Sequence, residues 1–324
     1  MCTCITYENG DFYFGRNMDL EYRFGEKVVI MPRNFRFPLK EGKLLNRSYA
    51  MIGMASVAEG CPLYAEAVNE KGLTMAGLNF PGNAIYRQAQ KDMKNITPYE
   101  LIPWVLGQCE NIKETALLLK DLNLLNTPFS ENLPLAPLHW MISGRDGSLV
   151  LESVEDGVHL YENPFGVLTN NPPFPYYQYH LGNYRNLTPL FPENHFAADS
   201  ELPVLGQGLG AVGLPGDFSP VSRFVKAAFL RTNARSEKNE ISNISQMFHM
   251  LEGVSMVRGA VVTEEGKYDI TTYSCCINAD KGIYYYRTYE NSAIQAINLH
   301  HEDLDAEVLK IFGLSEQQQI KMHN

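Results

Sequence analysis

Short runs of apolar and aromatic residues, bounded by Gly, Asn and Asp, recur near both ends of the chain, and this pattern predicts β-strands. The first two runs flank Asn9-Gly10, a dipeptide that favours a tight hairpin turn because both residues tolerate a positive φ. We therefore expect a hairpin formed by residues 2–7 and 12–16. Further strands are predicted at residues 49–57, 73–78, 138–143, 148–154, 166–168, 268–278 and 282–289.

Helical spacing of apolar residues occurs in two clusters between these strands. Ser219-Pro220 combines a capping side chain with proline at the first helical position, and it predicts a helix with Phe224 on its apolar stripe. Thr97-Pro98 has the same signature and predicts a helix that ends near residue 108. Two more helices are expected at residues 112–122 and 241–251. Helix pairs that interrupt the strands twice favour an α+β protein with two sheets and outer helices.

Composition narrows the functional classes. The 324 residues include 27 basic and 37 acidic side chains, a net charge of −10, which disfavours binding to nucleic acid or to an anionic membrane. With 45% hydrophobic residues the chain can build a large core. Its apolar runs are all shorter than the roughly 18 residues of a membrane span. The N-terminus lacks a secretory signal pattern, so we expect a cytoplasmic protein with six reduced cysteines.

Two patterns suggest cofactors but lack the context that those cofactors require. Residues 208–213 match the G-x-G-x-x-G pattern of dinucleotide-binding loops, but a proline follows where a helix should continue. We interpret this segment as a structural glycine loop, with a nucleotide-dependent enzyme as the alternative. The cysteine spacings do not match zinc-binding pairs. His139 is interpreted as a hydrogen-bonded core residue rather than as the base of a cysteine hydrolase, and Cys61 and Cys109 as small buried residues.

Cys2 stands apart because of its position. Removal of Met1 is usual before a small residue, and Cys2 would then carry both a free α-amine and a thiol. An α-amine titrates at about 7.7–8.0 and a thiol at about 8.5, so near neutral pH the amine can accept the thiol proton without a histidine. Cys2 would be its own nucleophile and base. The alternative is an ordinary residue near a chain terminus.

The expected hairpin places charged groups beside Cys2. Folding about Asn9-Gly10 sets Thr3 opposite Arg16 and Cys2 opposite Asn17, with Asp19 just beyond on the Cys2 face. Asp19 could then hold the terminal amine, and Arg16 could favour the thiolate or bind an anionic group. A shift of one residue would exchange the two faces. The alternative for Arg16 and Asp19 is a surface ion pair.

Several motifs together resemble the choloylglycine hydrolase family, and they cover essentially the whole chain. They are Met-Cys-Thr at the start, Phe-Gly-Arg-Asn-Met-Asp at 14–19, Asn-Glu-Lys-Gly-Leu at 69–73, Ala-Gly-Leu-Asn-Phe at 76–80, Leu-His-Trp at 138–140, Gly-Val-Leu-Thr-Asn at 166–170, Gly-Leu-Pro-Gly-Asp at 213–217 and Ser-Arg-Phe at 222–224. The resemblance implies an N-terminal-nucleophile hydrolase with an αββα sandwich. It also implies a single domain over residues 1–324, with a mature chain that starts at Cys2.

The resemblance implies a site as well. Cys2 would be the nucleophile, Asp19 and Arg16 would position and tune it, and Asn170 and Arg223 would complete the catalytic set. Asn79 and Asn170 would donate hydrogen bonds to the oxyanion of the tetrahedral intermediate. The position of Asn79 is usually Asn in members that act on bile salts and Tyr in penicillin V acylases. The implied substrates are therefore conjugated bile salts such as glycocholate and taurocholate, and the implied steroid pocket consists of Met18, Ala58, Phe129 and Leu133.

The resemblance implies no metal or cofactor, and it suggests a homotetramer. Cys4 departs from relatives that have a small or hydroxyl residue there, and it could oxidise with Cys2 because the two share a strand face. Two alternatives stay open besides the nucleotide-dependent enzyme. One is a penicillin V acylase, or another N-acyl amide acylase, of the same fold. The other is a non-catalytic bile-acid-binding protein.

Overall fold

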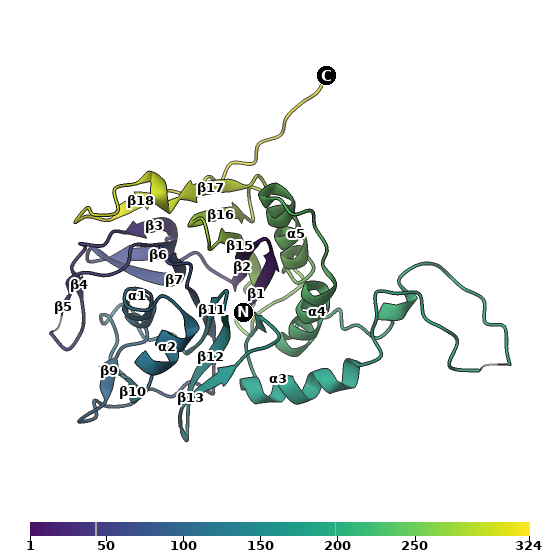
Figure 1. The fold of residues 1–324 in the computed structure, drawn as a ribbon, viewed down its shortest axis with the longest axis horizontal. Coiled ribbons are helices and arrows are strands. Elements are labelled where there is room, and N and C mark those ends of the chain that lie inside the picture. The colour runs from purple at the N-terminus through teal and green to yellow at the C-terminus, as the bar shows by residue number, and fades with distance from the viewer. Residues whose placement is uncertain (43, 198) are drawn as a thin grey trace.

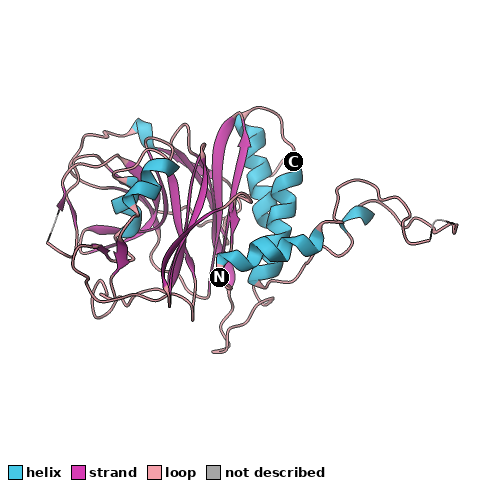
Figure 2. Cartoon of the chain, turned by 60° about the horizontal axis from the view of Figure 1, so that its bottom comes forward, coloured by secondary structure: helices cyan, strands magenta, loops and turns pink. Residues whose placement is uncertain are grey.

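A computed structural model describes residues 1–42, 44–197 and 199–324. Two β-sheets pack face to face and helices cover their outer faces, which gives four layers (Figures 1 and 2). The expected αββα sandwich is confirmed. The reason lies in the sequence pattern, because strands that are apolar on both faces need a partner sheet on one side and helices on the other.

The six-stranded sheet contains predicted strands from both the N-terminal and the C-terminal parts of the chain. Its order is β14 (Val167–Leu168), β1 (Cys2–Asn9), β2 (Asp11–Leu20), β15 (Ile270–Asn278), β16 (Ile283–Thr288) and β17 (Gln295–Asn298). The hairpin of β1 and β2 is confirmed. Both strands are interior, so β1 lies between β14 and β2, and the first residues of the chain reach the centre of the molecule.

The eight-stranded sheet is built from the middle of the chain and one C-terminal strand. Its order is β13 (Gly157–Glu162), β12 (Gly147–Val154), β11 (Leu138–Gly144), β8 (Thr74–Asn79), β7 (Cys61–Asn69), β6 (Met51–Ala58), β3 (Lys27–Met31) and β18 (Lys310–Phe312). Strands β3, β7, β13 and β18 were not predicted. Two further pairs lie outside the sheets: β4 (Phe37–Pro38) with β5 (Leu44–Leu45), and β9 (Lys94–Ile96) with β10 (Leu122–Leu124).

Each outer layer contains a pair of helices. Helices α4 (Pro220–Asn233) and α5 (Glu240–Glu252) pack on β1, β2 and β15, whereas α1 (Leu101–Leu106) and α2 (Ile112–Leu118) pack on β7, β8, β11 and β12. The Ser219 cap is confirmed, because its side chain accepts a hydrogen bond from Ser222 N. The same prediction for Thr97 is wrong. There the Glu100 carboxylate accepts from the Thr97 backbone N–H, the chain turns, and the helix begins only at Leu101.

Strand alternation divides the apolar side chains between two cores. On β3, Val28 and Ile30 face the six-stranded sheet, and Val29 and Met31 face α1 and α2. The same division holds along the neighbouring strands. The inter-sheet core also contains Cys2, so the candidate nucleophile lies in an apolar layer.

The segment between α3 (Phe174–His180) and α4 extends away from the sandwich. Between the end of α3, with its following turn η1 (Leu181–Tyr184), and the start of α4 the chain projects as an arm, which includes the turn η2 (Leu209–Ala211) (Figures 1 and 2). The glycine-rich motif at 208–213 forms the single turn η2 and no strand–helix junction. η3 (Leu299–His301) is the remaining short helix. Across the described ranges, no helix combines the length and the apolar character that a membrane span requires.

Candidate active site

Cys2 is the first residue of β1, and its side chain is 2% exposed. Its backbone nitrogen donates a hydrogen bond to Asn170 Oδ1 at 3.0 Å. Met1 continues the chain outward, where its amine contacts Asp19 O at 2.5 Å and Asp269 Oδ2 at 3.4 Å. The Cys2 nitrogen therefore faces the Asn170 side chain, whereas Asp19 and Asp269 contact the Met1 amine.

The register of the β1–β2 hairpin differs by one residue from the prediction. Cys2 pairs with Met18, and Cys4 pairs with Arg16. The cause is the turn: Asn9 pairs with Asp11, and the chain reverses around Gly10 alone, which has a φ of +83°. A one-residue shift exchanges strand faces. The prediction that Asp19 shares the Cys2 face is therefore wrong, and Arg16 has that place instead.

Arg16 is the charged group that contacts the Cys2 thiol. Its Nη2 lies 3.2 Å from Cys2 Sγ and donates to Gly77 O at 2.6 Å. Its Nη1 donates to Ala65 O at 2.6 Å and to Glu66 Oε2 at 2.8 Å. Burial alone lowers the pKa of a guanidinium, but the neighbouring Cys2 and Glu66 side chains raise the Arg16 pKa above its usual value. Arg16 is thus a fixed cation beside the sulfur.

The opposite face of β2 carries a second buried pair. Asp19 Oδ2 lies 3.8 Å from Arg223 Nη1, and Asp19 Oδ1 accepts from the Thr271 hydroxyl at 2.6 Å. Burial raises the pKa of Asp19 and lowers the pKa of Arg223. Arg223, in the first turn of α4, donates to Cys2 O at 2.6 Å and to Thr3 Oγ1 at 2.5 Å. This pair holds the main chain of the first residues, whereas Arg16 contacts the side chain of Cys2.

Asn170 connects these groups from the segment that follows β14. Its Oδ1 accepts from Cys2 N and from Arg223 Nη2, the latter at 2.7 Å. Its Nδ2 donates to the backbone oxygen of Asn79 at 2.6 Å, at the end of β8. The structure therefore brings together six sequence-predicted residues: Cys2, Arg16, Asp19, Asn79, Asn170 and Arg223.

Of the four residues predicted to form the steroid pocket, Met18 contacts Cys2. Met18 Sδ lies 3.8 Å from Cys2 Sγ. Ala58 ends β6, and Phe129 packs edge-on against Tyr99 with ring centroids 5.3 Å apart. Leu133 lies in the same loop as Phe129 and is 40% exposed. Ala58, Phe129 and Leu133 stay a prediction as pocket residues.

The other residues considered as catalytic or metal-binding candidates, His139 and the cysteines, are buried in the fold. His139 is fully buried, with Nδ1 3.0 Å from Glu152 Oε1 and Nε2 3.0 Å from Thr169 O, as expected of a hydrogen-bonded core histidine. All six cysteines are free thiols and buried. Within the described ranges, no three His, Cys, Asp or Glu side chains group as a candidate metal site.

Sequence reasoning missed the groups that hold Arg16. Glu66 lies on the unpredicted strand β7, and its carboxylate also accepts from Tyr273 and Tyr284 across the sheet interface. One signal was present: Glu66 has the same alternation phase as Val68, which faces the inter-sheet core. An acidic residue at an inward position of an apolar strand indicates a buried partner.

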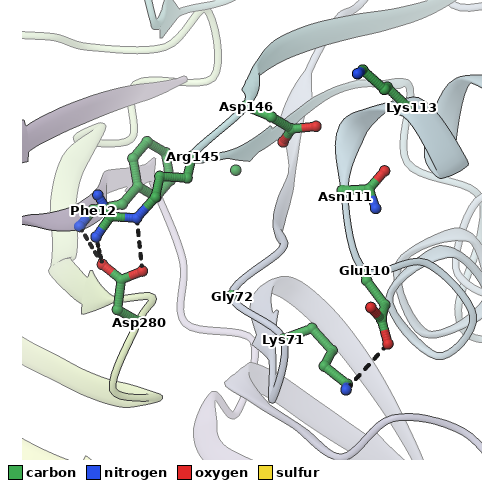
Figure 3. A pocket seen from close by; sticks show the side chains of 10 residues that line it. Phe12, Lys71, Gly72, Glu110, Asn111, Lys113, Arg145, Asp146 and Asp280 are labelled. Atoms are coloured by element: carbon green, nitrogen blue, oxygen red, sulfur yellow. Dashed lines mark hydrogen bonds and ion pairs between the residues drawn. The ribbon is translucent and has the colours of Figure 1, made fainter.

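A polar cavity of about 370 Å³ lies near the turn end of the first hairpin, lined in part by Phe12, Arg145 and Asp280 (Figure 3). Cys2 is the first of the eight residues of β1 and the turn follows the last, so the two lie about 25 Å apart along an extended strand. The cavity's charges pair with each other, for example Arg145 with Asp280 at 2.6 Å and Lys71 with Glu110 at 3.1 Å. It is therefore separate from the site at Cys2.

Comparisons with known proteins agree with this geometry. The family of linear amide C–N hydrolases, choloylglycine hydrolase family, matches residues 2–312. The chain is 46% identical to a "Bile salt hydrolase/transferase" of Lactiplantibacillus plantarum, over 98% of both chains. It is 41% identical to a protein of the same description from Clostridium perfringens, over 96% of both chains.

Solved structures give the same result. A cysteine-to-alanine mutant of the conjugated bile acid hydrolase from Clostridium perfringens superimposes with a TM-score of 0.94, at 40% identity and with full coverage of both chains. Penicillin V acylase from Agrobacterium tumefaciens has a TM-score of 0.76 at 18% identity, over 96% of this chain and 90% of that one, which supports the fold alone. The fold is that of the N-terminal-nucleophile hydrolases. The chain belongs to the choloylglycine hydrolase family and is an amide C–N hydrolase.

Proposed function

We propose that this enzyme hydrolyses the amide bond of glycine- or taurine-conjugated bile salts, with Cys2 as nucleophile after Met1 is removed. One observation carries the proposal: a buried thiol at the start of an inner strand has a guanidinium nitrogen 3.2 Å away, while its own backbone nitrogen meets Asn170 Oδ1. The relatives' names supply the substrate class, since both are described as acting on bile salts.

In the first step the α-amine of Cys2 takes the thiol proton, and the thiolate attacks the amide carbonyl carbon. The carbonyl oxygen becomes an oxyanion. Asn170 Nδ2 donates one of its two hydrogens to Asn79 O, so its second N–H can donate to the oxyanion. The side-chain amide of Asn79 offers another donor. One such donor is worth about 2.7–4 kcal/mol in a transition state. The α-ammonium then protonates the departing nitrogen, the C–N bond breaks, and a thioester remains on Cys2.

In the second step a water attacks the thioester carbon while the amine, neutral again, takes a proton from that water. The C–S bond breaks, the bile acid leaves, and the proton returns to the sulfur. Asn170 Oδ1 and the Asp19–Arg223 pair orient the amine through both steps, since they surround the Cys2 main chain. Arg16 stabilises the thiolate; its Nη1 and Nη2 already have acceptors within the protein, and its Nε is buried without one.

Substrate recognition then depends on apolar burial. Arg16 and Arg223 are each 1% exposed and bonded to the protein, so they do not offset the net charge of −10 for an anionic substrate. Met18, Ala58, Phe129 and Leu133 form the proposed steroid pocket, and burial of a rigid hydrocarbon contributes about 25 cal/mol per Å². Binding should therefore depend only weakly on salt.

The same chemistry fits one alternative. The relatives' names include "transferase", and an amine that replaces water would resolve the same thioester to a new amide. A hydroxylamine competition assay separates the two outcomes: a hydroxamate product indicates transfer, and free acid alone indicates hydrolysis. A penicillin V acylase, by contrast, draws support from the fold alone.

We also propose that residues 1–324 act as one cytoplasmic domain that assembles into a homotetramer. Support for one domain comes from the shared inter-sheet core, which both ends of the chain help to build. Support for assembly comes from the arm between α3 and α4, whose exposed apolar side chains include Leu190, Phe191, Phe196, Leu205 and Val212. Clustered exposed apolar residues mark protein–protein contacts.

The test of the proposed activity is product release measured by mass spectrometry. Wild-type protein and Cys2→Ala are incubated separately with glycocholate, taurocholate and penicillin V. The proposal expects cholate from either conjugate with wild type only. Cleavage of penicillin V without cholate release would favour the acylase, and binding of cholate conjugates without any cleavage would favour a non-catalytic binding protein.

A further inference from the structure

Glu66 is a buried carboxylate that none of the proposed chemical steps uses. Its Oε2 lies 2.8 Å from Arg16 Nη1 and accepts from the Tyr273 hydroxyl at 2.9 Å. Its Oε1 accepts from the Tyr284 hydroxyl at 2.5 Å. Glu66 belongs to the eight-stranded sheet, and both tyrosines belong to the six-stranded sheet. The cluster therefore locks the two sheets together directly behind the Cys2 thiol.

Arg16 is shared between Glu66 and Cys2. One terminal nitrogen meets the carboxylate and the other meets the sulfur, and a guanidinium holds these nitrogens in one rigid plane. The position of the carboxylate therefore fixes the direction of the nitrogen that faces Sγ. The other acceptors are neutral: the carbonyls Ala65 O and Gly77 O, and the thioether Met18 Sδ at 3.6 Å. Glu66 is thus the anion with which the sulfur shares the guanidinium charge.

We propose that Glu66 is a positioning residue that controls the reactivity of Cys2 through Arg16. It directs Nη2 of Arg16 at the sulfur and takes up part of the guanidinium charge, so that thiolate formation is assisted but limited. The limit matters because a more strongly stabilised thiolate is a weaker nucleophile. This inference rests on the proposed role of Cys2 as the nucleophile.

The signs of two substitutions follow from the charges. Glu66→Gln keeps the shape and an acceptor oxygen for Arg16 but removes the negative charge, so the guanidinium stabilises the thiolate more and Cys2 reacts at lower pH. Tyr284→Phe removes a donor from Glu66, which leaves more carboxylate charge to compete for Arg16, so Cys2 reacts at higher pH. A residue that only supports the fold would not produce opposite shifts.

The other titratable groups around this face stay neutral in the relevant range. Burial raises the pKa of Cys4 on β1, of Cys275 and Tyr273 on β15, and of Tyr284 on β16 well above their usual values. Asp19, Asp269 and Arg223 surround the chain terminus, from the other face of β2 and from outside it. Apart from the α-amine that Cys2 gains when Met1 is removed, Arg16 and Glu66 are therefore the charges that face Cys2 Sγ from its own side.

The experiment measures the rate of Cys2 alkylation by iodoacetamide across a pH series, without substrate. Fragmentation mass spectrometry of the N-terminal peptide separates modification of Cys2 from that of Cys4. Tyr64→Phe is the matched control: Tyr64 lies on the same strand as Glu66, is buried, and donates to Val29 O at 3.2 Å in the other core. Thermal unfolding shows which variants are folded.

At a pH near the midpoint of the wild-type profile, we expect Glu66→Gln to react about threefold faster and Tyr284→Phe about threefold slower, with Tyr64→Phe unchanged. Any other pattern among the folded variants overturns the proposal. If Glu66→Gln does not fold, the comparison of the alkylation rates of Tyr284→Phe and Tyr64→Phe decides the proposal. Alkylation needs no turnover, so failure of the substrate assignment and failure of this inference are read from different assays.

Discussion

The side-chain oxygen of Asn170 accepts a hydrogen bond from the main-chain nitrogen of Cys2 at 3.0 Å, although the two residues are 168 positions apart. The nitrogen is the group that becomes the α-amine when Met1 is removed. Asn170 also keeps a side-chain N–H beyond the one that it gives to Asn79 O. In the proposed mechanism one residue can therefore orient the general base and donate to the oxyanion.

Asn170→Asp separates these two roles. The carboxylate keeps an acceptor for the amine but loses the amide donor, so we expect kcat to fall about 10²–10³-fold. Asn170→Leu loses both functions and should fall further. Steady-state kinetics with glycocholate measure both variants. A wild-type kcat in Asn170→Asp would show that the amide donor does not act in the transition state.

Arg16→Leu tests the buried ion pair with Glu66. Removal of the guanidinium leaves a fully buried carboxylate without its cation, and we expect the free energy of unfolding to fall by about 3–5 kcal/mol. Arg16→Leu combined with Glu66→Leu should lose less than the single variant, because no charge is left unpaired. Urea denaturation measures both. A double variant less stable than Arg16→Leu would contradict this explanation.

Asp19 predicts a pH dependence of stability. Its folded pKa is raised by burial above the ordinary value of 3.8, so the folded state resists ionisation more than the unfolded chain does. The carboxyl therefore stabilises the fold below that value, and this contribution is lost as pH rises through the folded pKa. Relative to wild type, Asp19→Asn should gain stability between pH 4 and pH 7. Denaturation curves across that range measure the free energy of unfolding of both proteins, and a difference that stays constant or shifts in favour of wild type as pH rises would refute it.

Cys4 is expected to be inert. It is completely buried, and burial raises the pKa of its thiol well above the usual value. Two residues on one face of an extended strand also lie near the upper limit of Cα separation for a disulfide. Under diamide we expect no Cys2–Cys4 disulfide, and Cys4→Ala should keep wild-type activity. Non-reducing peptide mapping detects the bridge if it forms.

The arm provides a test of assembly. Phe196 and Leu205 are 92% and 90% exposed in the isolated chain. A Phe196→Lys, Leu205→Lys double variant should dissociate the proposed homotetramer, because buried charges at an interface are unfavourable. Light scattering after size exclusion measures the mass. Ile241→Lys, at an exposed apolar position on α5 outside the arm, is the control. A monomeric wild type would rule out the proposed assembly.

Local sequence signals predicted much of the fold because they depend on near neighbours. Ser219-Pro220 predicted the start of α4, and Asn9-Gly10 located the first hairpin. The register was wrong because one glycine rather than two residues makes the turn, a difference that the dipeptide alone does not encode. Thr97-Pro98 misled because the Glu100 carboxylate binds the Thr97 N–H and starts a turn instead of a helix.

The site was predictable only in part for the same reason. The resemblance to the choloylglycine hydrolase family identified Asn170 and Arg223 as site residues. Both lie far from Cys2 in sequence, and the fold brings them into contact with it. Glu66 was missed because its role depends on Tyr273 and Tyr284 across the sheet interface. The alternation of β7 indicates that Glu66 has a buried partner, but the packing of the two sheets determines which residues those partners are.

The most direct test of the account is to trap the acyl-enzyme. Wild-type protein is mixed with glycocholate, quenched in acid within milliseconds, and its N-terminal peptide is analysed by mass spectrometry. We expect a peptide that begins at Cys2, without Met1, with a cholyl group on sulfur that hydroxylamine removes. A turning-over enzyme that retains Met1, or that carries the acyl group on another residue, would contradict the central claim.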